Sequence, residues 1–92
     1  MDLDFIDQEA RQRYTLRRMQ DLDKCRHFLS KRDFEGIRTI GHNLKGNGIS
    51  FGFPELSTLG EQLEFSARDS NFDQVKSLID SFESWIAGQQ KQ

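Results

Sequence analysis

Apolar residues recur every three or four positions through most of the chain, which is the spacing of one buried face of an α-helix. β-branched residues are sparse and do not alternate with polar ones, so no strands are expected. Polar or glycine-containing breaks divide this pattern into four segments. We therefore predict helices over approximately residues 4–31, 34–51, 54–69 and 72–87.

The last three predicted helices each have a distinct apolar face. The buried positions expected from their spacing are Phe34, Ile37, Gly41, Leu44, Gly48 and Phe51, then Leu56, Leu59, Leu63 and Ala67, and finally Val75, Leu78, Ile79, Phe82 and Ile86. Ile40 is expected to flank the second face. In the first helix the apolar stripe is blurred, because Leu16 and Phe28 fall outside the side shared by Tyr14, Met19, Leu22, Cys25 and Leu29.

Three residues mark where the later helices begin. Asp33 and Asn71 are typical N-caps, and Asn71 is followed three positions later by Gln74, as in a capping box. Pro54 suits the first turn of a helix, where its missing N–H is not needed. Four helices with short connections have antiparallel neighbours, so the predicted fold class is all-α: an antiparallel up-down four-helix bundle, forming one domain over residues 1–92.

Composition and charge exclude several classes of function. The 92 residues carry a net charge of -2, which gives no general attraction to nucleic acid or to an anionic membrane surface. No apolar run approaches the roughly 20 residues needed to cross a bilayer, and the start of the chain is acidic, unlike a secretory signal. Cys25 is the only cysteine, so no internal disulfide can form. We expect a monomer in the cytoplasm.

The second predicted helix contains more glycine than a helix normally tolerates. Each glycine inside a helix costs about 1 kcal/mol relative to alanine, and four are present: Gly36, Gly41, Gly46 and Gly48. Gly41 and Gly48 lie on the buried face, where close helix packing is a sufficient reason. Gly46 lies almost opposite the core, so packing does not explain it.

The outward face around Gly46 combines groups suited to phosphoryl chemistry. It reads Arg38, His42, Lys45, Gly46 and Ile49. A neutral imidazole can attack phosphorus near neutral pH, and a lysine one turn away can neutralise phosphoryl oxygens. A missing side chain leaves room for a partner's active site to close over the ring, and Ile49 offers apolar contact area.

The segment His42-Asn43-Leu44-Lys45-Gly46, followed by Gly52, resembles the H-x-L-K-G…G signature of histidine-phosphotransfer domains. The resemblance extends over roughly residues 34–68. It implies that His42 is phosphorylated at Nε2, that Lys45 stabilises the phosphate and that Gly46 provides clearance. One departure is Asn47-Gly48, where the family frequently has two small residues; Asn47 can therefore affect partner choice.

The resemblance also implies that a side chain on the next helix orients the histidine by hydrogen bonding to its other nitrogen. Glu64 stands at the matching position, and Gln62 is a weaker candidate. On a helical wheel Glu64 lies at the flank of its helix and outside the core, which permits this role. Arg68, one turn further, is expected to meet the phosphoryl group or an acidic partner, and Arg38, Ile49 and Arg68 form a candidate docking surface.

The chain carries no motif for making its own phosphohistidine. Residues 41–50 lack the G-x-x-x-x-G-K-[ST] spacing of an ATP-binding loop, and no acidic cluster is placed to hold Mg²⁺. We therefore expect a phosphoryl carrier that is not an enzyme and has no cofactor or metal. A sensor histidine kinase or a response-regulator receiver would donate the phosphoryl group, and the receiver would supply the Mg²⁺.

Other interpretations use the same residues differently. One is a helical adaptor, or an inhibitor that binds a kinase or receiver without being phosphorylated. Another is a nucleic-acid binder that uses a basic cluster of the first helix, formed by Arg11, Arg13, Arg17 and Arg18. Acidic neighbours border this cluster and no aromatic platform accompanies it, which disfavours this interpretation. A metal site from Cys25, His27 and His42 is disfavoured, because His42 is on another helix and no ligand pair has helical spacing.

Overall fold

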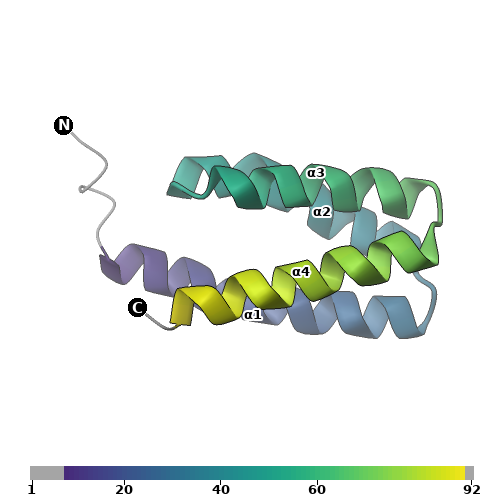
Figure 1. The fold of residues 1–92 in the computed structure, drawn as a ribbon, viewed down its shortest axis with the longest axis horizontal. Coiled ribbons are helices and arrows are strands. Elements are labelled where there is room, and N and C mark those ends of the chain that lie inside the picture. Colours follow the sequence, from purple (N-terminus) through teal and green to yellow (C-terminus); the bar gives the residue numbers. More distant parts are fainter. Residues whose placement is uncertain (1–7, 91–92) are drawn as a thin grey trace.

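Four helices account for nearly all of residues 8–90, the part of the chain that the computed structural model describes. They are α1 (Gln8–Ser30), α2 (Phe34–Gly48), α3 (Pro54–Arg68) and α4 (Phe72–Gln90), with a short 3₁₀ turn, η2 (Ile49–Phe51), after α2. Figure 1 shows each helix running antiparallel to the one before it, with α2 and α3 above α1 and α4 in this view. The predicted all-α antiparallel four-helix bundle is confirmed. None of the helices in residues 8–90 is long and apolar enough to cross a membrane.

The last three helices start at the residues that the sequence predicts, but the capping box is only half formed, because the Asn71 N–H donates to Ser66 O at 3.0 Å. The Asp33 carboxylate accepts a hydrogen bond from the Gly36 N–H at 3.1 Å, and the Asn71 side-chain oxygen accepts one from the Gln74 N–H at 3.2 Å. Pro54 occupies the first turn of α3. Each group satisfies or removes an N–H that has no partner within its own helix.

Two helix ends differ from the sequence prediction. The second predicted helix is interrupted at Gly48, where the chain tightens into η2 and then turns at Gly52, whose φ of 87° lies in the left-handed region. The fourth helix continues to Gln90, three residues beyond its predicted end. Gly88 does not end α4: it keeps helical geometry, and no atom lies within 4 Å of a Cβ placed there. Residues 4–7 of the first predicted helix lie outside the described residues.

Apolar side chains from all four helices meet in one core. Its fully buried members include Ile37, Leu44, Leu56, Leu63, Val75, Ile79 and Phe82. The prediction was inexact at the core edge: Ile40 is buried, although it was expected at the flank, while Phe34, Phe51 and Leu59 are only half-buried. Cys25 is fully buried, and this burial raises the pKa of its thiol to about 12, so it is not a reactive thiol near neutral pH.

The packing of α2 against α3 is the most extensive in the bundle, and three glycines permit it. A Cβ atom on Gly41 would lie 2.7 Å from the Glu64 backbone nitrogen. A Cβ atom on Gly60 would lie 2.6 Å from the Lys45 backbone nitrogen. Both distances are shorter than real Cβ contacts, and the atoms met are backbone. Gly48 is a third such position, because its Cβ would lie 2.8 Å from the Ser57 backbone nitrogen. The two helices can approach this closely only because these positions lack a side chain.

We expect opposite effects from alanine at the crossing and at the exposed glycine. Gly60→Ala should lower the free energy of unfolding by about 1–3 kcal/mol, because the added methyl overpacks the α2–α3 contact. Gly46→Ala should raise it by about 0.5–1 kcal/mol, because no atom lies within 4 Å of the new Cβ and alanine favours helix. Urea denaturation of both variants measures the change in the free energy of unfolding. The same change in both variants would contradict the assigned packing.

Candidate functional site

His42 projects from the middle of α2 into solvent, with 68% of its side chain exposed. Its direction follows from its neighbours on the helix. Gly41 faces α3 and Leu44 is fully buried, so the two residues between them, His42 and Asn43, point outward. The exposure that the sequence predicts for this ring is present in the structure.

Glu64, on α3, holds the ring from one side. His42 Nδ1 and Glu64 Oε2 are 3.1 Å apart. A carboxylate has no proton to donate, so the Nδ1–H of the imidazole is the donor and the tautomer is assigned from this contact. In a neutral ring, Nε2 then has a free lone pair directed away from α3. The weaker candidate, Gln62, is exposed, and the hydrogen bond to Nδ1 comes from Glu64.

Glu64 is more deeply buried than the helical wheel predicts. The wheel put it at the flank of its helix, but its side chain is only 11% exposed. The cause is the close approach of α2 at Gly41, whose backbone lies directly against that of Glu64. A buried carboxylate needs a hydrogen-bond donor, and the imidazole supplies one.

Lys45 contacts a second glutamate on α3, which the sequence analysis did not single out. Its Nζ lies 3.4 Å from Glu61 Oε2, and the two side chains are 44% and 47% exposed. Lys45 is three residues after His42, and Glu61 is three residues before Glu64. In an antiparallel helix pair this spacing gives a second contact parallel to the first. Once His42 and Glu64 had been paired, the sequence alone was sufficient to find Glu61.

Gly46 leaves open space beside the ring, with no atom within 4 Å of a Cβ placed there. Two shallow depressions flank the imidazole. One of about 260 Å³ is lined by Arg38, Thr39, His42 and Glu64. The other, of about 430 Å³, lies toward α1 and is lined by Arg18, Asp21, His42, Asn43, Gly46 and Asn47. The ring is therefore reachable from both sides.

Asn47 turns toward α1 and away from the His42 ring. Its side-chain oxygen accepts hydrogen bonds from the Tyr14 hydroxyl at 2.6 Å and from Arg18 at 3.4 Å. Arg18 also lies over the Tyr14 ring at 4.4 Å and pairs with Asp21 at 2.9 Å. Burial of the Tyr14 side chain raises the pKa of its phenol, which stays protonated and able to donate. The residue that departs from the family pattern thus anchors α2 to α1.

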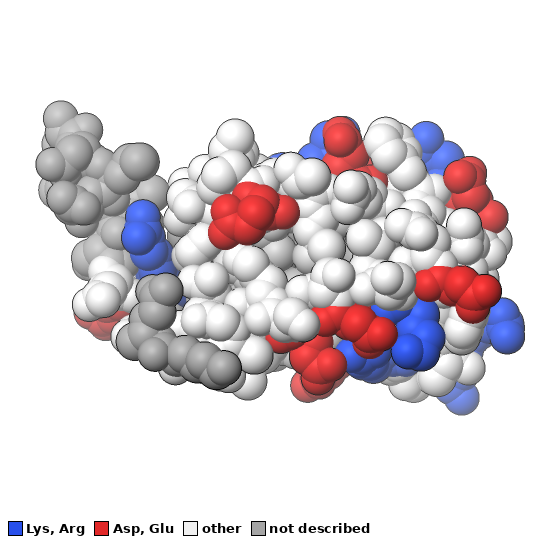
Figure 2. All heavy atoms as spheres, in the orientation of Figure 1, with Lys and Arg blue, Asp and Glu red and all other residues white. Residues whose placement is uncertain are grey.

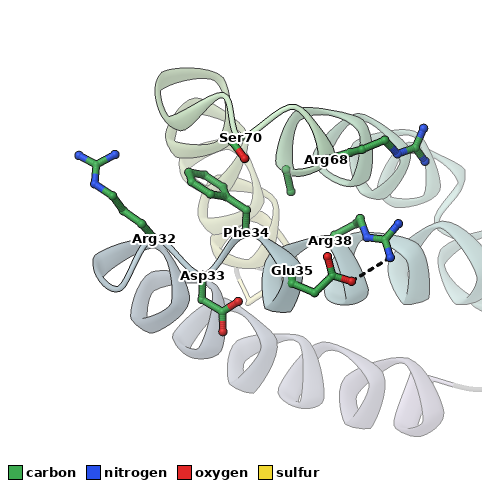
Figure 3. Close-up of a pocket in the computed structure, with 8 residues that line it drawn as sticks. Arg32, Asp33, Phe34, Glu35, Arg38, Arg68 and Ser70 are labelled. Carbon is green, nitrogen blue, oxygen red and sulfur yellow. Dashed lines mark hydrogen bonds and ion pairs between the residues drawn. The ribbon is translucent and has the colours of Figure 1, made fainter.

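Two of the three predicted docking residues, Arg38 and Arg68, lie on the same two helices as His42 and Glu64. Arg38 pairs with Glu35 at 2.8 Å, and Arg68 lies over the Phe65 ring at 5.0 Å. Both line a depression of about 540 Å³ at the end of the α2–α3 pair. In Figure 3 their side chains extend to one side of it, while Arg32 points the other way.

Two large apolar side chains are exposed on this half of the bundle, one in η2 directly after α2 and one in α3. Ile49 is 63% exposed, as the sequence predicts. Phe65, adjacent to Glu64 in α3, is 45% exposed and was missed. Phe65 lies outside the three-to-four-residue spacing of the buried positions of α3. This spacing could have indicated that its side chain is exposed.

Charges elsewhere are mixed in sign. Figure 2 shows acidic and basic side chains close together on the face formed by α3 and α4, with much of its middle uncharged. Of the first-helix arginines, Arg13 pairs with Glu9 at 3.0 Å and Arg11 lies 5.9 Å from the Phe53 ring. Within residues 8–90, no three His, Cys, Asp or Glu side chains gather where they could hold a metal ion.

The fold and this site together define a helical bundle that presents one oriented, accessible imidazole. The family model of the Hpt domain matches residues 9–88. The chain therefore belongs to the Hpt domain family, whose members are phosphocarrier modules of histidine phosphorelays that interact with kinases and receivers. No curated protein and no solved structure matches the chain.

The contact with Glu64 predicts the tautomer of His42. In the neutral ring, ¹⁵N chemical shifts should identify Nδ1 as the protonated nitrogen and Nε2 as the free one. In Glu64→Ala the acceptor is lost, and the protonated nitrogen should shift mainly to Nε2. His27, which is exposed and makes no contact with a carboxylate in the described residues, is the internal reference. An unchanged His42 spectrum in the variant would contradict the orienting contact.

Proposed function

We propose that this protein carries a phosphoryl group on His42 Nε2, taking it from a kinase or a receiver aspartate and passing it to a receiver. The observation that supports this most strongly is the combination of an exposed ring, a carboxylate at Nδ1 and open space at Gly46. The carboxylate leaves Nε2 as the nucleophile, and the open space admits a second protein. Membership of the Hpt domain family agrees with both.

From this chain, the transfer step needs only the His42 imidazole and the Glu64 carboxylate that orients it. The Nε2 lone pair attacks the phosphorus of an aspartyl phosphate, the N–P bond forms, and the P–O bond to the aspartyl carboxylate breaks. The ring then carries a positive charge, and the Nδ1–H remains hydrogen-bonded to Glu64, whose negative charge stabilises it. Transfer to the next receiver reverses these steps.

The other residues take supporting roles in this proposal. Lys45, one turn from His42, neutralises charge on the phosphoryl oxygens. The protein needs no ATP site or catalytic centre of its own, and the Mg²⁺ comes with the receiver. Arg38 and Arg68 meet acidic groups of the partner, while Ile49 and Phe65 give apolar contact area around the ring.

Labelling of paired histidine variants tests the carrier role. A receiver loaded with ³²P should transfer acid-labile, alkali-stable label to the wild-type protein and to His27→Gln, but not to His42→Gln. The two variants make the same change at exposed positions, so a difference between them identifies the site. Label that persists in His42→Gln would refute the assignment. Binding of a receiver without any labelling would favour the adaptor or inhibitor.

The size of the phosphoryl donor should decide how much a side chain at position 46 matters. Gly46→Gln should slow transfer from a receiver at least about tenfold, because displacing the partner spoils the in-line approach. Labelling by phosphoramidate, a small donor, should change little. Gly88→Gln is the matched control, since Gly88 is also helical with no atom within 4 Å of a Cβ. Equal slowing with both donors would contradict the clearance role.

A further inference from the structure

The two glutamates that α3 presents to α2 differ in how firmly they are held. Glu64 is almost enclosed, with a side-chain exposure of 11%, and its partner is the reacting ring. Glu61 is 47% exposed and its partner is Lys45, itself 44% exposed. An ion pair in which both side chains are exposed to solvent is weak, and either side chain can readily pair with another group instead. The first contact is therefore fixed, whereas the second can open.

Phosphorylation of His42 would place a competitor for Lys45 beside Glu61. A phosphoryl group carries a charge of about −1.5 to −2 near neutral pH. His42 and Lys45 are three residues apart on one helix, where side chains are neighbours. Lys45 would then lie within reach of two anions, the phosphoryl group and the Glu61 carboxylate.

We propose that Glu61 is a positioning residue that competes with the phosphoryl group for Lys45 and so keeps the phosphohistidine ready to give up its phosphoryl group. This rests on the carrier function proposed above. With Glu61 present, Lys45 is shared, the phosphorylated state is less stabilised, and onward transfer to a receiver is favoured. Without the carboxylate, Lys45 would be available to the phosphoryl oxygens and the phosphoryl group would be retained.

The equilibrium of phosphoryl exchange with a receiver tests this inference. Glu61→Gln keeps the shape of the side chain and removes its charge. It should shift the equilibrium toward phosphohistidine by roughly two- to fivefold, the range that partly exposed ion pairs give. The shift should shrink as salt is raised to about 1 M, because screening then acts within about 3 Å. An unshifted equilibrium, or a shift toward the receiver, would overturn the proposal.

Two control variants separate this role from a general effect of charge. Glu83→Gln makes the same charge change on α4, where Glu83 pairs with Arg26 of α1 at 2.8 Å, and it should leave the equilibrium unchanged. In a Lys45→Ala background, Glu61→Gln should lose most of its effect. A shift of full size without Lys45, or an equal shift in Glu83→Gln, would overturn competition for Lys45.

Failure of the carrier function would look different from failure of this inference. If the wild-type protein takes up no label at His42, the proposed function is wrong. If it is labelled and Glu61→Gln exchanges as the wild type does, the carrier function stands and only the role of Glu61 is lost. Thermal unfolding of each variant, followed by circular dichroism, verifies that the exchange is measured on folded protein.

Discussion

The close approach of α2 and α3 at Gly41 and Gly60 is the constraint on which the rest of the site depends. Each glycine faces the backbone of the other helix, so neither position can accept a side chain without moving a helix. At this separation a short glutamate side chain can reach across to a ring on the facing helix. The same approach covers Glu64, which turns an otherwise exposed carboxylate into an enclosed acceptor. Packing of the bundle and orientation of the imidazole therefore have a single cause.

Enclosure of Glu64 and exposure of His42 are complementary. A carboxylate removed from water is costly unless a donor meets it, and an Nδ1–H facing a carboxylate is a strong donor. The contact thus fixes the ring without hiding it, because only its Nδ1 edge faces the protein. If both groups were buried, Nε2 would be inaccessible. If both were exposed, the ring would rotate freely and water would compete for each hydrogen bond.

The sequence predicted the fold class, the helix caps and the outward direction of His42, because these depend on local spacing and on backbone groups within one helix. It did not predict how deeply Glu64 is enclosed or that Asn47 bonds to Tyr14, because both depend on the distance between helices. Gly60 shows what the sequence of one helix cannot predict. It was not singled out, because the composition of α3 is otherwise ordinary, yet it faces the backbone of Lys45 in α2. The role of a glycine at a crossing becomes visible only when its partner helix is known.

The depressions around His42 are shallow and open, which suits a site that another protein completes. An enzyme that acts on a small molecule encloses its substrate and holds the catalytic groups around it. Here the chain offers an exposed imidazole, an enclosed carboxylate that accepts from it and several nearby cations, and the two depressions beside the ring stay open to solvent. The proposed transfer needs both rigid support beneath the ring and open space above it, since the reacting phosphorus would arrive with a partner and would have to meet Nε2 in line. The crossing built on Gly41, Gly48 and Gly60 provides the support, and Gly46 on the outer face provides the space.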